Sequence, residues 1–190
     1  MTDTILSGTP ESWTRLPVQT LFSLSKSELV SLQLHWAQTR FQQLQEHIPA
    51  LDALAEKQGV KIITDFETLA TILFTHQVYK NYPFAFIERK LFTELTRWLN
   101  KLTAHDLSSL DMRGVNTIDE WLTRLDEAGM FVFHSTGTSG KLSFFPRSQT
   151  EKEAWVEGTY TFLEAFMPGI RDLYLPVFWP AYRSGRQASM

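Results

Sequence analysis

A run of seven small, hydroxylated, glycyl or cationic residues, Ser135–Lys141, stands between apolar segments and has the sequence Ser-Thr-Gly-Thr-Ser-Gly-Lys. Gly137 and Gly140 permit positive φ angles and carry no Cβ atom that would keep backbone N–H groups away from a ligand. The hydroxyl groups add hydrogen-bond donors, and Lys141 adds a mobile positive charge. Successive N–H groups in such a turn form a concavity that binds anions. These residue types therefore indicate a loop that binds a polyphosphate.

A flexible, solvated hairpin turn rich in Gly, Ser and Thr is the alternative interpretation of this segment. A hairpin needs a connection of only about two to five residues, and the flanking Phe131–Phe133 and Leu142–Phe145 are unusually apolar for a turn in water. The Walker A pattern is excluded because only two residues separate Gly137 from Gly140 and because Leu142 follows the lysine. The dinucleotide-binding Gly-x-Gly-x-x-Gly pattern does not fit either. The chemistry alone leaves phosphate binding and a solvated turn open.

The same seven residues resemble the signature loop of the adenylate-forming superfamily, which contains acyl- and aryl-CoA synthetases, peptide-synthetase adenylation domains and luciferases. That loop usually reads Thr-Ser-Gly-Thr-Thr-Gly-Lys-Pro-Lys, and seven consecutive positions agree in residue type. Leu142 replaces the usual proline and Ser143 the usual second lysine, which indicates an outlying branch similar to phenylacetate-CoA ligases or to bacterial luminescence acyl-protein synthetases. Thr71–Pro83 and the segment that contains Trp121 resemble, in general layout, the helical N-terminal part of such AMP-binding proteins.

This resemblance implies ATP-dependent activation of a carboxylic acid. A carboxylate oxygen attacks the α-phosphorus of ATP, which gives an acyl-adenylate and pyrophosphate, and a thiol or amine acceptor then takes the acyl group. In the family, backbone N–H groups and hydroxyls of the loop hold the β- and γ-phosphates, and Mg²⁺ neutralises further charge. The residues that would hold ATP by position are Ser135, Thr136, Gly137, Thr138, Ser139, Gly140 and Lys141.

Other segments typical of the family do not occur between Lys141 and Met190. These are an aromatic-Gly-x-Thr-Glu segment, a Thr-Gly-Asp segment that holds the ribose, and a catalytic lysine in a small C-terminal domain. Glu157–Tyr160 is the closest string, but its order differs and it lies in a predicted helix. The resemblance therefore predicts the N-terminal segment of an acid–thiol ligase, incomplete and inactive alone, and it identifies no catalytic residue in this chain.

Helical segments are expected to position the loop, because a Ser/Thr-x-x-Glu pattern that can cap a helix occurs four times before apolar residues at helical spacing. The four patterns begin at Ser25, Thr64, Thr117 and Ser148. Gly129 stands where a left-handed cap would end the third helix. The helical segments expected are 25–49, Asp65–His76, Phe84–Leu102, Ile118–Ala128 and Gln149–Phe166.

Strands are expected to be few. Phe131–Phe133 and Leu142–Phe145 flank the loop, and Leu173–Phe178 is β-branched, aromatic and apolar enough to form a third strand. The predicted fold class is α/β and helix-rich, with a helical region followed by the first strands of an incomplete sheet. The resemblance places this arrangement in the N-terminal part of a synthetase large domain. The expected organisation is an irregular lead-in over 1–24 and a partial adenylation domain over 25–190, helical over 25–128, with the phosphate-loop hairpin and the following helix and strand over 129–190.

The composition excludes several classes of protein. Eighteen basic and 21 acidic residues give a net charge of −3 without a run of like charges, so no footprint for nucleic acid or an anionic membrane is present. The absence of cysteine excludes disulfides and thiolate metal sites and fits a reducing compartment. The apolar tracts are far shorter than the roughly 20 residues of a membrane span. We therefore predict a cytoplasmic protein without a nucleic-acid partner or a membrane span.

The remaining candidate residues have both a functional and a structural interpretation. The histidines show no short ligand spacing, so no metal site is predicted. His134 adjoins the loop and can contact a nucleotide or acyl substrate, or bond the loop backbone at the end of a strand. Arg147 can add charge to the phosphate region. Trp36, Trp98 and Trp121 are expected in the core. The alternative function is a non-catalytic helical binding or scaffolding module whose Ser/Thr/Gly loop contacts a phosphorylated or acidic partner.

Overall fold

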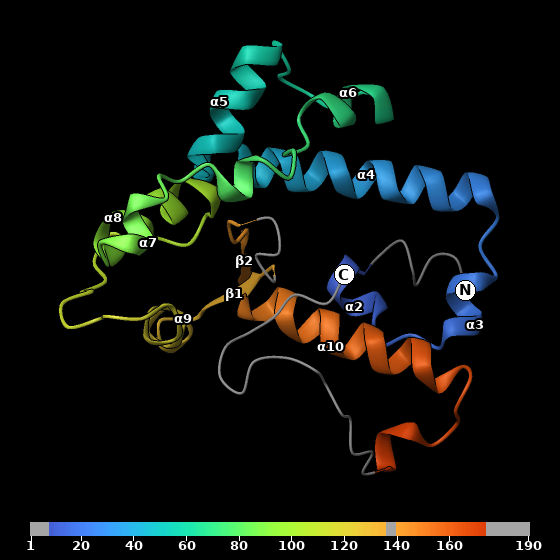
Figure 1. The fold of residues 1–190 in the computed structure, drawn as a ribbon. Helices are drawn as coiled ribbons and strands as arrows, with labels where there is room; N and C mark the ends of the chain where they lie inside the picture. Colours follow the sequence, from blue (N-terminus) through green and yellow to red (C-terminus); the bar gives the residue numbers. More distant parts are fainter. Residues whose placement is uncertain (1–7, 136–139, 174–190) are drawn as a thin grey trace. The chain divides into compact units, whose positions relative to one another are not determined.

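The computed structural model describes residues 8–135 and 140–173 (Figure 1). The protein is helix-rich, and the described residues contain one small antiparallel sheet of two strands. The helix-rich class predicted from the sequence is therefore confirmed. The described chain forms two compact units, one of residues 8–37 with 149–173 and the other of residues 38–135 with 140–148.

Five helical segments belong to the first unit, including the first turns of a longer helix. They are α2 (Pro10–Trp13), α3 (Val18–Phe22), the start of α4 (Lys26–Leu44), α10 (Gln149–Glu164) and the 3₁₀ helix η4 (Ile170–Asp172).

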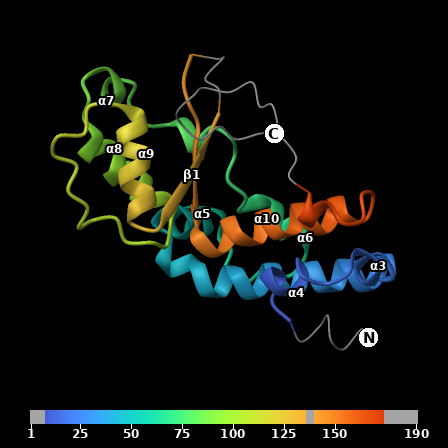
Figure 2. The same ribbon diagram turned by 90° about the horizontal axis from the view of Figure 1, so that it is seen from below.

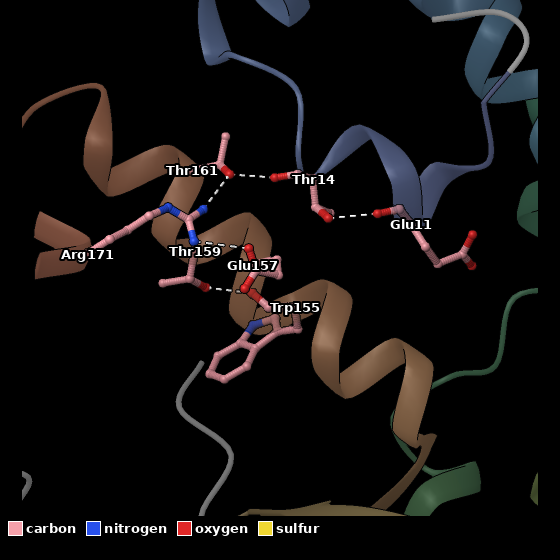
Figure 3. A network of polar contacts seen from close by, with 7 residues as sticks. All are labelled: Glu11, Thr14, Trp155, Glu157, Thr159, Thr161 and Arg171. Carbon is pink, nitrogen blue, oxygen red and sulfur yellow. Dashed lines mark hydrogen bonds and ion pairs between the residues drawn. The ribbon is translucent and has the colours of Figure 1, made fainter. Parts of the chain in front are cut away.

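A polar network joins the end of α2 to α10 and η4 (Figure 3). The Thr161 hydroxyl donates to the backbone carbonyl of Thr14. The Arg171 guanidinium donates to that hydroxyl at 3.1 Å and forms an ion pair with Glu157 at 3.0 Å. The bond between Thr14 and Thr161 joins residues 147 positions apart in the sequence, so the network connects the beginning of the first unit to its end.

Two of the predicted helix starts, those of α4 and α10, lie in the first unit. The capping box before α4 is confirmed, because the Ser25 N–H donates to the Glu28 carboxylate at 2.8 Å and the Glu28 N–H donates to Ser25 Oγ at 3.3 Å. Helix α10 begins at Gln149 as predicted but ends at Glu164, two residues before the expected Phe166. A carboxylate oxygen of Glu164 accepts the N–H of Gly169 at 2.6 Å, which favours an earlier end of the helix.

The second unit contains the remaining helices and both strands. Its elements after α4 are η1 (Gln45–His47), α5 (Pro49–Gln58), α6 (Phe66–Thr71), η2 (Val78–Lys80), α7 (Ala85–Glu88), α8 (Phe92–Leu99), η3 (Asn100–Leu102), α9 (Ile118–Glu127), β1 (Met130–His134) and β2 (Phe144–Ser148).

The two strands form an antiparallel hairpin beside α9, which leads directly into β1 (Figure 1). Met130, Val132 and His134 alternate with less buried residues, as expected for a strand with one face on the core. Helices α8 and α9 pack on that face (Figure 2). The core consists of Tyr82, Phe92, Leu95, Leu99, Leu107, Met112, Val115, Trp121, Leu122, Leu125, Met130, Val132 and Phe144.

The three tryptophans expected in the core differ in burial. Trp121 is completely buried, and its indole N–H donates to the Thr96 hydroxyl at 2.8 Å. Trp98 is partly buried and packs against the same core. Trp36 is partly buried in the first unit, where its ring lies 6.0 Å from that of Trp13. The prediction is therefore confirmed fully only for Trp121.

The single helix predicted over Phe84–Leu102 is wrong, because this segment forms α7, α8 and η3. Lys90 breaks it with a φ of 55°. The N–H of Lys90 donates to the carbonyl of Ile87 at 3.1 Å, and the N–H of Leu91 donates to that of Phe86 at 2.7 Å. These two bonds form the Schellman arrangement that ends a helix. The glycine that usually occupies this position is replaced by Lys90, so no residue type marks the break.

The start of α6 also differs from the prediction. Asp65, and not Thr64, caps the helix by accepting the N–H of Thr68 at 2.7 Å. The helix ends at Thr71, five residues before the predicted His76. Helix α9, in contrast, is confirmed, since Thr117 accepts the N–H of Glu120 at 3.2 Å. The predicted left-handed residue after it is confirmed as well, because Gly129 has a φ of 82°.

Candidate phosphate-binding loop

The candidate loop joins β1 to β2 at the end of the hairpin where His134 pairs with Phe144. Of the seven predicted residues, the structure describes Ser135, Gly140 and Lys141. The other four, Thr136, Gly137, Thr138 and Ser139, lie outside the described residues.

Two serines close the base of the loop. The N–H of Ser135 donates to the carbonyl of Ser143 at 3.0 Å, and the N–H of Ser143 donates to the Ser135 hydroxyl oxygen at 2.9 Å. A side chain thus takes one of the two bonds that backbone groups would make in a regular ladder. The Ser135 hydroxyl keeps its own proton for donation to a ligand.

Gly140 has the backbone geometry that the sequence predicts for this loop. Its φ is 86°, in the region that favours glycine, and no heavy atom lies within 4 Å of the position that a Cβ atom would occupy. The φ angle, rather than lack of space, therefore explains the glycine at this position.

Lys141 is held at the end of the loop by Tyr82. Its Nζ donates to the backbone carbonyl of Tyr82 and lies 4.3 Å from the centroid of the Tyr82 ring. Both contacts favour the ammonium form, and a lysine has three N–H donors, so further donors stay available. Burial and the nearby charge of Lys80 lower the pKa of Lys141. Lys141 is thus a positioned cation and not a freely moving side chain.

Tyr82 is the residue of this site whose role the sequence did not reveal. It is completely buried, and its hydroxyl donates to the backbone carbonyl of Leu142 at 2.9 Å. Its ring contacts those of Trp98 and Phe144, with centroids 4.9 and 5.5 Å away. Burial raises the pKa of the Tyr82 phenol to about 12. Tyr82 therefore fixes both Lys141 and the backbone that follows it.

These contacts explain why β2 begins at Phe144 and not at the predicted Leu142. The Leu142 carbonyl bonds to the Tyr82 hydroxyl, and the Ser143 N–H bonds to the Ser135 hydroxyl, so neither group joins the ladder. The third strand was predicted over Leu173–Phe178. The structure describes only Leu173 of it, and residues 174–178 lie outside the described residues.

His134 is buried at the start of the loop and uses one ring nitrogen there. Its Nδ1 lies 3.0 Å from the carbonyl oxygen of Ser135. Because a carbonyl can only accept, Nδ1 carries the proton in this bond, and Nε2 of the neutral ring is an acceptor. Nε2 is buried and has no hydrogen-bond partner among the residues that the structure describes. The expected bond to the loop backbone is confirmed, and a contact with nucleotide or acyl substrate stays a prediction.

Arg147 does not lie at the phosphate end of the hairpin. It pairs with Phe131, three residue pairs from the His134–Phe144 pair that adjoins the loop. At about 3.3 Å per residue, this separation is about 10 Å along the strand. The positive charge at the end of the loop therefore comes from Lys141, whose pKa the nearby charge of Lys80 helps to lower, whereas Arg147 acts on Tyr79 and lowers its pKa against the effect of burial.

No three His, Asp or Glu side chains among residues 8–135 and 140–173 are grouped so that they could hold a metal ion. No helix in these ranges combines the length and the apolar character that crossing a bilayer requires.

Comparisons of the chain with protein-family models, with curated proteins and with solved structures find no match.

Proposed function

We propose that this chain supplies the pyrophosphate-binding part of a ligase that activates a carboxylic acid with ATP. The observation that carries the proposal is Lys141, a cation fixed by Tyr82 at the end of a long Gly/Ser/Thr loop. A merely solvated turn needs no positioned cation. The loop base closed by Ser135 and the left-handed Gly140 give further support, since both belong to the pattern that resembles the adenylate-forming signature.

The proposed reaction begins when a carboxylate oxygen bonds to the α-phosphorus of ATP. The bond from that phosphorus to the bridging oxygen breaks, and its electron pair leaves with pyrophosphate. Donors that already point at the departing group stabilise the negative charge that develops there. Ser135, Gly140 and Lys141 would act in this way, together with residues 136–139. The acyl group then passes to a thiol or an amine, and AMP leaves.

The residues of the loop fit a polyphosphate better than a bare metal ion. Segment 130–148 contains no Asp or Glu, so it has no carboxylate to ligate Mg²⁺. A magnesium ion would therefore be held mainly by phosphate oxygens and water and would neutralise part of their charge.

The proposal includes a place for this chain in a larger architecture. Strands β1 and β2 pair with each other in the described chain, and their outer edges have no further strand there. We infer that they are the first strands of a larger sheet, as in the large domain of adenylate-forming synthetases. The ribose-binding and catalytic groups would then come from outside residues 1–190.

Isothermal titration calorimetry of the chain with magnesium pyrophosphate and with MgATP tests the proposal. Lys141→Ala is expected to weaken the binding of both ligands about tenfold or more, because a hydrogen bond to a charged group contributes about 1.5–3 kcal/mol. Lys57→Ala on α5 removes an equal charge outside the loop and should bind like the unchanged chain. Absence of binding by the unchanged chain would contradict the proposal. Tighter binding of a phosphoserine peptide than of either ligand would favour the non-catalytic module instead.

A further inference from the structure

We propose that Lys80, which lies outside the signature loop, contacts the same anion as Lys141, so that the two lysines select a ligand with two linked phosphates. This inference rests on the proposed function, because it assigns a second residue to the same pyrophosphate site. It adds to that site a residue of η2, which is separate from the signature loop in the sequence.

The segment that carries Lys80 is fixed against the hairpin by aromatic packing. The Tyr79 ring lies 4.6 Å from the ring of Phe145, and the Tyr82 ring lies 5.5 Å from that of Phe144. The Tyr82 hydroxyl bonds to Leu142 at 2.9 Å. Lys80 lies between these two anchored tyrosines, so its backbone cannot move far from the start of β2.

Lys80 is also close to Lys141 along the chain path. Lys141 Nζ bonds to the backbone carbonyl of Tyr82, two residues after Lys80. Since neighbouring Cα atoms are about 3.8 Å apart, the Cα atoms of Lys80 and Tyr82 are at most about 7.6 Å apart. Both lysines are partly exposed. Both side chains are long and flexible, and they start from segments that meet at the contacts of Tyr82 with Lys141 and Leu142, so both ammonium groups can be directed at one anion.

The surroundings of the two lysines lack negative charge. No Asp or Glu occurs in residues 68–87 or 130–148, the two segments that meet here, although the chain has 21 acidic residues. In the part of the chain that the structure describes, no carboxylate forms an ion pair with Lys80 or Lys141. The charge of Lys80 contributes to the lowered pKa of Lys141, which indicates that the two cations repel each other. An anion between them would remove this repulsion.

The arrangement favours a ligand with two phosphates over one. Lys141 is anchored at Tyr82 and at the end of the loop, whereas Lys80 approaches from a separate element, η2. Two cations from different anchors can each bond a different phosphate of pyrophosphate. A single orthophosphate carries less charge and fewer oxygens, and it would gain less from the second lysine.

The test is calorimetry of the full chain with magnesium pyrophosphate and, separately, with inorganic phosphate. Lys80→Ala is expected to weaken pyrophosphate binding about tenfold and to change phosphate binding much less. Lys80→Arg should restore most of the loss, because it keeps the positive charge. Lys57→Ala is the matched control on α5. Circular dichroism checks that each variant is folded, and Lys80→Gln provides a second neutral variant.

The outcomes separate this inference from the proposed function. If Lys141→Ala weakens pyrophosphate binding but Lys80→Ala and Lys80→Gln do not, the role of Lys80 is wrong and the proposed function stands. If both neutral Lys80 variants weaken the binding of phosphate and of pyrophosphate equally, the proposal that the two lysines select a ligand with two phosphates is wrong. If the unchanged chain binds neither pyrophosphate nor MgATP, both proposals are overturned.

Discussion

A single buried tyrosine connects the core of the second unit to the candidate site. Tyr82 packs against Trp98 and Phe144, while its hydroxyl holds Leu142 and its carbonyl and ring hold Lys141. The residues that the ligand would contact are therefore positioned by a residue that the ligand would not touch. Loss of the Tyr82 hydroxyl should affect stability and leave the lysine contacts, which use the ring and the carbonyl.

The titration of Tyr82 predicts a loss of stability at alkaline pH. Burial raises its pKa from 10.0 to about 12 in the folded chain. The stabilisation that comes from the neutral phenol is fully present below pH 10. It is lost as the pH rises through 12, which lowers the free energy of unfolding by up to about 2.7 kcal/mol in total. Urea denaturation should show a loss of about 1.4 kcal/mol from this group between pH 8 and pH 11.

The Tyr82→Phe variant is the control for that measurement. It removes the titrating hydroxyl and keeps Lys141, whose lowered pKa has the opposite effect, because deprotonation of Lys141 relieves a cost of burial as the pH rises. The variant should be about 1 kcal/mol less stable at pH 8, since the bond to Leu142 is lost. An identical pH dependence in the two chains would contradict the role assigned to Tyr82.

At the scale of the element, helix starts were predictable where the capping side chain is local. Ser25 and Thr117 cap α4 and α9 as the spacing of their glutamates predicts. The same pattern was misleading at Thr64, because the neighbouring Asp65 accepts the N–H of Thr68 and caps the helix one residue later. Local patterns thus locate a helix well and its first residue less well.

The break at Lys90 was not predictable, since a lysine with positive φ has no signature in the sequence. It also leads to a prediction. Lys90→Gly should increase the free energy of unfolding by about 0.5–1 kcal/mol, because glycine adopts this φ without the strain of a Cβ atom. Chemical denaturation measures the change. Lys101→Gly is the control in η3, and it should be destabilising because glycine weakens a helical segment.

The site was only partly predictable for a similar reason. Ser135, Gly140 and Lys141 lie within seven consecutive positions of the sequence, so their residue types and spacing could predict an anion-binding loop. The contact from Tyr82 to Leu142 spans 60 residues and depends on how the η2 segment packs on β2. No local pattern encodes such a contact. The absence of acidic residues from 68–87 and 130–148 was visible, but its meaning depends on the two segments meeting.

At the scale of the whole molecule, charge is distributed unevenly along a chain that is acidic overall. The net charge is −3, yet the two segments that meet at the loop contain Lys80, Lys141 and Arg147 and no carboxylate. An anion would therefore be attracted by this local arrangement and not by the net charge. This arrangement predicts binding of a compact polyphosphate and gives no reason to expect binding of nucleic acid.

The most direct test of phosphate binding by the loop is an NMR titration of the ¹⁵N-labelled chain with magnesium pyrophosphate. We predict saturable shifts of the backbone amides of Ser135, Gly140 and Lys141, with smaller changes at Gly59 and Gly114, which have positive φ angles elsewhere in the same unit. Addition of magnesium chloride alone should leave these amides unchanged. Absence of shifts at the loop, or equal shifts throughout the chain, would contradict a phosphate-binding site between β1 and β2.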